Sequence, residues 1–327
     1  MDIGPIISRR RRGPRRPGMT LVELLVVLAI LGILAGIILP AVHASREAAR
    51  RTQCQSHQRQ IGLGVVNFEA AQRVFPASGW TQRGPGNPYG TFMSWRTVIL
   101  PHLEHADVRL LYDVQRNWWE GTNLAVAAIP IPIYACPSTP TQEPVLQAVA
   151  KPPRPALGFV TPPARSDHEA IQGVQPNSID PLRYDANNRF AVMHRNSTTR
   201  RAAITDGASK TIMVVEAAGR PTVYRTGIRQ PGLSNDQGVG WADSEGAFSL
   251  DGASADGGRE GCRAANGCHV ALNARNDNEP YSFHADGIHA LFADGRTAFI
   301  HEAIALEVMA ALCTRAAGDG GPMVGVD

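Results

Sequence analysis

One carboxylate, Glu23, stands at the head of an apolar run that is long enough to cross a membrane. The run extends from Leu24 to Val42 and contains no charged residue. As a helix it would be about 28 Å long, which matches the hydrocarbon core of a bilayer. A carboxylate in lipid costs roughly 3 kcal/mol on insertion scales, so we expect Glu23 to have a partner that offsets this cost.

A cluster of arginines precedes the apolar run, at positions 9 to 12, 15 and 16. Basic residues favour the cytoplasmic side, so we expect residues 1–18 to face the cytoplasm and the bulk of the chain to lie outside it. Three kinds of N-terminus are compatible with this pattern: a secretory signal peptide cut before Ser45, a plain single-pass anchor, and a prepilin. The length of the run and Glu23 argue against the first, and Glu23 is only a cost in the second.

The segment Gly18–Glu23, of sequence GMTLVE, resembles the cleavage and methylation motif of type IV prepilins and type II secretion pseudopilins. The resemblance implies that a membrane peptidase cuts after Gly18 and methylates the new N-terminus at Met19. It also implies that Glu23 pairs with the terminal amine of a neighbouring subunit. The partners expected on this basis are the prepilin peptidase/methyltransferase, other pilin-like subunits and membrane lipid.

A second resemblance covers nearly the whole chain. His284 is followed by nine residues and then Asp294-Gly295, which is similar to the C-terminal H-X9-DG motif of a large family of bacterial pilin-like proteins. Other segments similar to that family are Arg51–Cys54, Gln60–Leu63, Ser94–Arg96, Cys136–Ser138, Ile204–Gly207 and Glu216. The resemblance implies a membrane-anchored, pseudopilin-like subunit with an enlarged outer domain, and it implies no reaction.

The histidines and aspartates around this motif could do chemistry of their own. His284 and His289, with Asp286 and Asp294 nearby, could hold a divalent ion or a ligand at the base of a hairpin. The favoured interpretation is turn chemistry, in which Asp294 serves the tight turn and His284 bonds to backbone at the strand entry.

Calcium is the remaining cofactor alternative, since it binds several oxygen ligands from one region. The candidate ligands match no known loop in their spacing; they are Asp251, Asp256, Glu260 and Asn266. We therefore expect no metal and no cofactor.

The chain has five cysteines and is expected to face an oxidising compartment, where disulfides form. Cys262 and Cys268 lie in one glycine-rich loop and could bridge locally. Cys54 and Cys136 could form a long-range pair, which leaves Cys313 over. Connectivity cannot be deduced from sequence, and free thiols remain an alternative.

Composition and motifs exclude two classes of function. The leader of residues 1–18 carries six Arg and one Asp, so its removal leaves 26 basic and 28 acidic residues of the 32 and 29 in the whole chain. The mature chain thus has no basic excess for nucleic acid. It also contains no Gly-x-Ser-x-Gly elbow, HExxH pair or phosphate-binding glycine loop. We therefore expect that the protein is not an enzyme.

The sequence predicts an α+β, pilin-like fold in four parts: a cleaved leader (1–18), a transmembrane helix (19–42), an extramembrane continuation of that helix (43–75) and a β-rich outer domain (76–327). The helix should end at Phe75 because Pro76 follows. Asp294-Gly295 predicts a hairpin with positive φ at both residues. A last helix is expected from about Glu302 to Ala316. Strands are expected at Ile131–Ala135, Phe190–Met193, Ala202–Ile204 and Thr211–Val215.

The function that fits these patterns is that of a structural subunit of a type II secretion or type IV pilus-like system, anchored once in the inner membrane. The alternative is a processed but non-polymerising module that binds an envelope component through its outer domain. Exposed tryptophans would favour the alternative and buried ones would remove its support; the five are Trp80, Trp95, Trp118, Trp119 and Trp241.

Overall fold

The computed structural model describes residues 19–141, 144–319 and 325–326. The chain divides into two units, residues 1–48 and residues 49–327. One helix, α1 (Leu21–Gln72), contributes its first part to the N-terminal unit and its second part to the outer unit. The predicted cleavage residue Gly18 lies outside the described residues.

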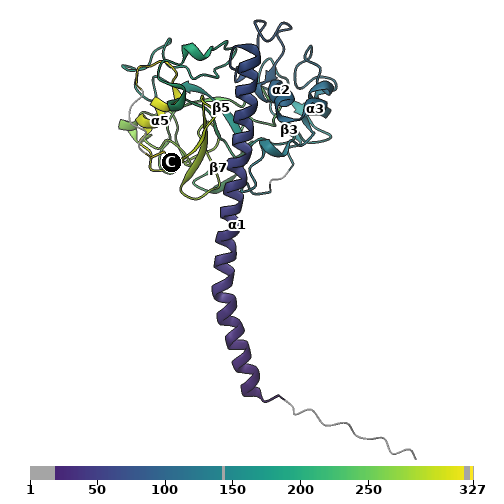
Figure 1. Ribbon diagram of the computed structural model, residues 1–327, viewed down its shortest axis with the longest axis vertical. Coiled ribbons are helices and arrows are strands. Elements are labelled where there is room, and N and C mark those ends of the chain that lie inside the picture. Colours follow the sequence, from purple (N-terminus) through teal and green to yellow (C-terminus); the bar gives the residue numbers. More distant parts are fainter. Residues whose placement is uncertain (1–18, 142–143, 320–324, 327) are drawn as a thin grey trace, which may run out of the picture. The chain divides into compact units, whose positions relative to one another are not determined.

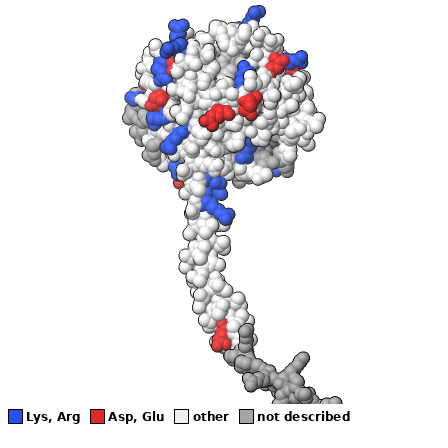
Figure 2. Space-filling model, turned by 45° about the vertical axis from the view of Figure 1, so that its right-hand side comes forward, with Lys and Arg blue, Asp and Glu red and all other residues white. Residues whose placement is uncertain are grey.

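The N-terminal unit is the apolar part of α1. The large apolar side chains from Leu21 to Leu39 are between 45% and 74% exposed, so the residues that the structure describes do not bury them. This stretch has a mean hydropathy of 2.9 and is long and apolar enough to cross a membrane. Figure 2 shows it as a surface without Lys or Arg, with acidic atoms at one end. In the sequence the next Lys or Arg is Arg46.

A capping box closes the N-terminus of α1. The Thr20 hydroxyl accepts a hydrogen bond from the backbone N–H of Glu23 at 3.3 Å. The Glu23 carboxylate accepts in return from the Thr20 backbone N–H at 2.8 Å and from the Thr20 hydroxyl at 2.9 Å. These bonds satisfy backbone donors that the first helical turn leaves unpaired.

The second part of α1 is a core element of the outer unit. Its buried residues are Cys54, Gln58, Ile61, Gly62, Gly64 and Val65, which recur at the spacing of one helical face. The small residues allow close packing, since a Cβ at Gly62 would lie 2.6 Å from Leu291. The helix ends at Gln72, slightly before the predicted end, and Arg73 follows with φ 62°.

A five-stranded sheet forms the centre of the outer unit, in the order β11-β10-β6-β5-β9. All neighbours are antiparallel except β5 and β9. The strands are β5 (His168–Val174), β6 (Ile212–Glu216), β9 (Phe248–Leu250), β10 (Gly287–Phe292) and β11 (Thr297–His301).

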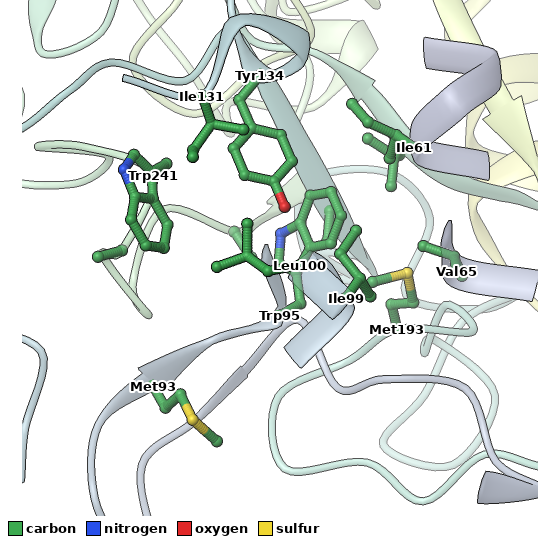
Figure 3. Packing of buried hydrophobic residues seen from close by; sticks show 14 of the residues in the cluster. Ile61, Val65, Met93, Trp95, Ile99, Leu100, Ile131, Tyr134, Met193 and Trp241 are labelled. Atoms are coloured by element: carbon green, nitrogen blue, oxygen red, sulfur yellow. The ribbon is translucent and has the colours of Figure 1, made fainter. Parts of the chain in front are cut away.

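The two faces of this sheet pack against different partners. One face, with Ala170, Val214 and Leu291, joins a cluster that contains Ile61 and Val65 of α1. Figure 3 shows these two side chains directed toward Trp95 and Tyr134. The other face packs against the last helix, α5 (Leu306–Cys313). In the view of Figure 1, α2 (Trp95–Ile99), α3 (Ala106–Leu111) and β3 (Gln147–Ala148) lie on one side of α1, and β5, β7 (Thr222–Arg225) and α5 lie on the other. The α+β fold that the sequence predicts is thereby confirmed.

The remaining elements are short. The helices are α2 (Trp95–Ile99), α3 (Ala106–Leu111) and α4 (Asn123–Ala127). The two-stranded pairs are β1 (Gly79–Trp80) with β2 (Met93–Ser94), β3 (Gln147–Ala148) with β4 (Leu157–Gly158), and β7 (Thr222–Arg225) with β8 (Ile228–Ser234). The 3-10 turns are Leu100–Leu103, Pro132–Tyr134, Arg201–Ala203, Ala208–Lys210 and Ala264–Asn266.

Three predicted strands are wrong. The segment Ile131–Ala135 contains the 3-10 turn Pro132–Tyr134, because Pro132 fixes φ and gives no backbone donor to a ladder. Residues 202–204 also belong to a 3-10 turn and its C-cap. Residues 190–193 make only an isolated bridge, between Phe190 and Gly173.

Candidate functional site

Four polar side chains meet inside the outer unit. They are Cys54, Cys136, Glu216 and His284, and one ligand-type atom from each lies within 4.8 Å of all the others. Cys54 Sγ lies 2.8 Å from Glu216 Oε1, and His284 Nε2 lies 3.3 Å from both Cys136 Sγ and Glu216 Oε1. None of the four residues is more than 4% exposed. We call this group the Cys-Cys-Glu-His cluster.

Four separate segments of the chain contribute one residue each to the cluster. Cys54 lies on the buried face of α1, and Glu216 ends the central strand β6. Cys136 follows the turn Pro132–Tyr134, and His284 lies in the connection that leads into β10. The cluster therefore forms where the helix crosses the sheet, and it exists only in the folded unit.

A second set of groups orients these side chains. The far oxygen of Glu216, Oε2, accepts a hydrogen bond from the backbone N–H of His289 at 2.6 Å and lies 3.2 Å from His289 Nδ1. The backbone N–H of Cys136 donates to the buried carboxylate of Asp167 at 2.8 Å. These bonds leave Glu216 Oε1 directed toward the two thiols and His284.

Burial and the neighbouring groups shift the pKa values of all four residues of the cluster. Hydrogen bonding to Cys136, burial and the charge of Glu216 raise the pKa of Cys54. The hydrogen bond from Cys54 lowers the pKa of Cys136 in spite of burial. Burial opposes the charge on His284, but its bonds to Cys136 and Glu216 prevail and raise its pKa to about 11. Burial also opposes the charge on Glu216, and the two histidines outweigh it and hold the pKa of Glu216 well below its usual value.

Other polar contacts fix α1 beside the cluster. His57 Nδ1 lies 3.0 Å from the carbonyl oxygen of Ala135, next to Cys136. Gln58 Nε2 donates to the carbonyl of His289 at 3.0 Å.

His168, in register with Glu216, is fully buried, and neither ring nitrogen has a hydrogen-bond partner among the described atoms. Burial lowers the pKa of His168 to about 3.

The residues of the predicted C-terminal motif divide between two places. His284 enters the cluster, whereas Asp294 and Gly295 form the turn between β10 and β11. The hairpin is confirmed, but positive φ at both turn residues is wrong: only Gly295 has it, at 92°. The connection between the two strands has four residues, Ala293 to Arg296, in which Gly295 N–H bonds to the Phe292 carbonyl and Asp294 accepts from Arg296 N–H.

The five cysteines behave in two ways. Cys262 and Cys268 are joined by a disulfide. The suggested pair of Cys54 and Cys136 is not bonded; both are buried free thiols within the cluster, and Cys313 is a buried free thiol elsewhere.

One of the oxygen ligands that the sequence offers for calcium is occupied by local hydrogen bonds. The Asp256 carboxylate accepts hydrogen bonds from Ser254 and Gly258 within its own turn. The Cys-Cys-Glu-His cluster is the one group with metal-ligand geometry among the residues that the structure describes, and it contains none of the four proposed calcium ligands.

All five tryptophans are buried in the cluster that contains Ile61 and Val65, so none forms an exposed binding surface. A pocket of about 680 Å³ does lie between β3, β4 and β8, lined by residues such as Val149, Leu157 and Leu233. It shares no residue with the Cys-Cys-Glu-His cluster. The binding-module alternative has thus lost its support from the tryptophans.

The sequence marks each member of the cluster and suggests that Cys54 and Cys136 lie close together, but it does not connect these thiols with Glu216 or His284. Cys54, Cys136 and His284 were candidate residues, and Glu216 lay in a segment similar to the pilin-like family. The local signals gave no indication that segments up to 231 positions apart, such as those of Gln58 and His289, meet.

Comparison with known proteins gives four findings. A family model described as a prokaryotic N-terminal methylation motif matches residues 14–39. The type II secretion system core protein G of Pectobacterium carotovorum subsp. carotovorum is 28% identical over 107 residues, which cover 26% of this chain and 69% of that protein. No solved structure matches. A model described as a protein of unknown function (DUF1559) matches residues 43–307, and the chain belongs to that family, with a prepilin-type N-terminus.

Proposed function

We propose that the chain is a processed pseudopilin-like subunit that assembles through its N-terminal helix in a type II secretion or type IV pilus-like system of the inner membrane. The observation that carries the proposal is the apolar helix that starts at Leu21, exposed on all sides and headed by one carboxylate at Glu23. The match to the methylation motif and the similarity to a type II secretion protein support it.

Processing provides the free amine that assembly needs. Cleavage after Gly18 would start the mature chain at Met19 and remove the arginine-rich leader. The leader would face the cytoplasm and the outer unit would lie beyond the membrane. In the filament, the carboxylate of Glu23 would exchange its bonds with Thr20 for the methylated amine of a neighbouring subunit, which gives the acid a charged partner in lipid.

The same exposed helix explains why subunits would associate. Its apolar side chains are satisfied by lipid in the single subunit and by neighbouring helices in a filament. An acid without a charged partner within the bilayer is costly, so Glu23 would favour the one axial register in which it meets an amine.

The test compares three substitutions in the native host. Glu23→Leu and Glu23→Gln remove the charge, and both should insert and be processed but fail to be incorporated into filaments. Thr20→Val removes the hydroxyl of the capping box and keeps the carboxylate, so it is the matched control and should assemble.

Two readouts are needed: intact mass, which shows whether the chain begins at N-methylated Met19, and the fraction of subunits in sheared or cross-linked filaments. Equal assembly of the Glu23 variants and the parent would refute the assembly role. A chain that begins at Ser45 or at Met1 would refute the processing step.

A further inference from the structure

We propose that the Cys-Cys-Glu-His cluster is a structural zinc site, in which Cys54, Cys136, Glu216 and His284 bind one ion and fasten helix α1 to the sheet. The proposal does not depend on filament assembly, because every ligand lies within the outer unit. It departs from the sequence-based expectation that the chain holds no metal.

The distances fit a tetrahedral ion. Zinc binds sulfur at about 2.3 Å and nitrogen or oxygen at about 2.0–2.2 Å, so its ligand atoms lie about 3.3–3.8 Å from one another. His284 Nε2 is 3.3 Å from both Cys136 Sγ and Glu216 Oε1, and all four atoms are within 4.8 Å of each other. The contact from Cys54 Sγ to Glu216 Oε1, at 2.8 Å, is shorter than this range.

The chemistry of the four ligands selects the ion. Two thiolates with one imidazole and one carboxylate form a soft to intermediate set, which suits zinc and disfavours calcium and magnesium. Four protein ligands leave no open position for water or substrate, and the site is buried, so the arrangement is that of a structural centre and not of a catalytic one.

The surroundings provide the outer contacts that zinc sites use. Glu216 Oε2, the oxygen that does not face the thiols, is held by the backbone N–H and the ring of His289. Asp167 accepts from the backbone N–H of Cys136 and so fixes the loop that carries the second thiol. Such outer partners orient the ligands and raise metal affinity.

A disulfide between Cys54 and Cys136 is the competing use of the two thiols. It would need neither a buried carboxylate nor an imidazole, yet Glu216 and His284 both converge on the sulfurs. Burying two thiols, an acid and a histidine together is costly unless their charges are paired, and one divalent cation pairs with them all at once.

The experiment uses the full-length chain, purified in detergent through a tag without histidine and without chelators. We expect one zinc per chain by elemental mass spectrometry. Cys54 and Cys136 should resist alkylation until the protein is unfolded with a chelator, and should then react without any reductant. Cobalt(II) exchanged into the site should show the absorption of a tetrahedral cobalt–thiolate centre.

Substitutions of single residues test whether the zinc binds at this cluster. Cys136→Ser should lose zinc, and Glu216→Gln should bind it at least tenfold more weakly. Cys313→Ser, which removes an equally buried free thiol outside the cluster, should keep one zinc per chain. Where a variant does not fold, the cobalt spectrum of the parent chain decides.

Three results would overturn the proposal. The first is a Cys54–Cys136 disulfide in the non-reduced peptide map with no bound metal. The second is a folded parent chain with two free thiols that takes up neither zinc nor cobalt. The third is zinc that is retained in a folded Cys136→Ser protein. None of these results bears on processing at Met19 or on assembly, so this proposal and the assembly proposal fail independently.

Discussion

Cys54 Sγ lies 2.8 Å from Glu216 Oε1, although 162 positions separate the two residues in the chain. The contact joins the helix that continues from the apolar N-terminus to the central strand of the sheet. It is the point at which α1, β6 and two loops share one set of buried polar groups. The stability of the outer unit should therefore depend strongly on this small group of atoms.

Glu216→Ala should destabilise the outer unit by about 3 kcal/mol or more, because it leaves His284 and His289 buried without their carboxylate. The measurement is the midpoint of thermal unfolding, followed by tryptophan fluorescence. Glu302→Ala removes an exposed carboxylate and should change stability by no more than about 0.5 kcal/mol. Equal midpoints for the two variants would show that the cluster contributes nothing to stability.

Gly62→Ile should destabilise the packing of α1 on the hairpin by about 1–3 kcal/mol. A Cβ at Gly62 would lie 2.6 Å from Leu291 and 3.1 Å from the carbonyl oxygen of Gly295, so a branched side chain does not fit. Leu63→Ala is the control on the neighbouring position, where the side chain is 63% exposed. Urea unfolding of both variants should show a lower midpoint only for the first, and a tolerated Gly62→Ile would contradict the close approach.

Gly295→Ala should cost about 1–3 kcal/mol, since Gly295 has φ 92° and an added Cβ would also lie 3.2 Å from Val66. Gly158→Ala places the same methyl group in open space at ordinary φ and should be neutral or slightly stabilising. Amide exchange in β10 and β11 provides the local readout. Unchanged protection of the hairpin in the first variant would argue against a strained turn.

Asp251→Asn should make the protein more stable at pH 7 and leave it unchanged at about pH 4. Burial and the neighbouring Glu260 raise the pKa of Asp251 to about 6, so the folded state keeps a proton that the unfolded chain has lost. The contribution of this carboxyl to stability thus falls as the pH rises from about 4 to 6.

The gain at pH 7 should be about 1 kcal/mol, because Asp251 is partly exposed and solvent reduces the full effect. Thermal midpoints at the two pH values measure it, with Glu302→Gln as the exposed control. A gain of the same size at pH 4 would mean that ionisation of Asp251 is not its cause.

The sequence predicted the elements whose patterns are local. The apolar run, the proline that follows Phe75 and the Asp294-Gly295 turn locate α1 and the hairpin within a few residues. The last helix is also present, but it is shorter than expected and covers only Leu306–Cys313. In each case neighbouring residues alone determine the conformation.

Strand β5, next to the central strand β6, could not be found in this way. It begins His168-Glu169 and contains Gln172, which is the composition of an exposed loop. The strand is buried because Glu169 pairs with Arg96 at 2.7 Å and accepts a bond from the Trp95 indole at 3.1 Å. Those partners lie more than 70 positions away, so only the assembled fold shows that the charge is compensated.

The position of α1 in the core also determines when the protein can finish folding. Its buried face is synthesised early, yet Gln58 bonds to His289 and Gly62 packs against Leu291. Until the last hairpin has been synthesised, these helix positions have nothing to pack against. The buried face of α1 therefore stays exposed in the nascent domain. A fold with such long-range closure forms slowly and all at once. A chain stopped before β10 should therefore remain unfolded and become a substrate for proteolysis.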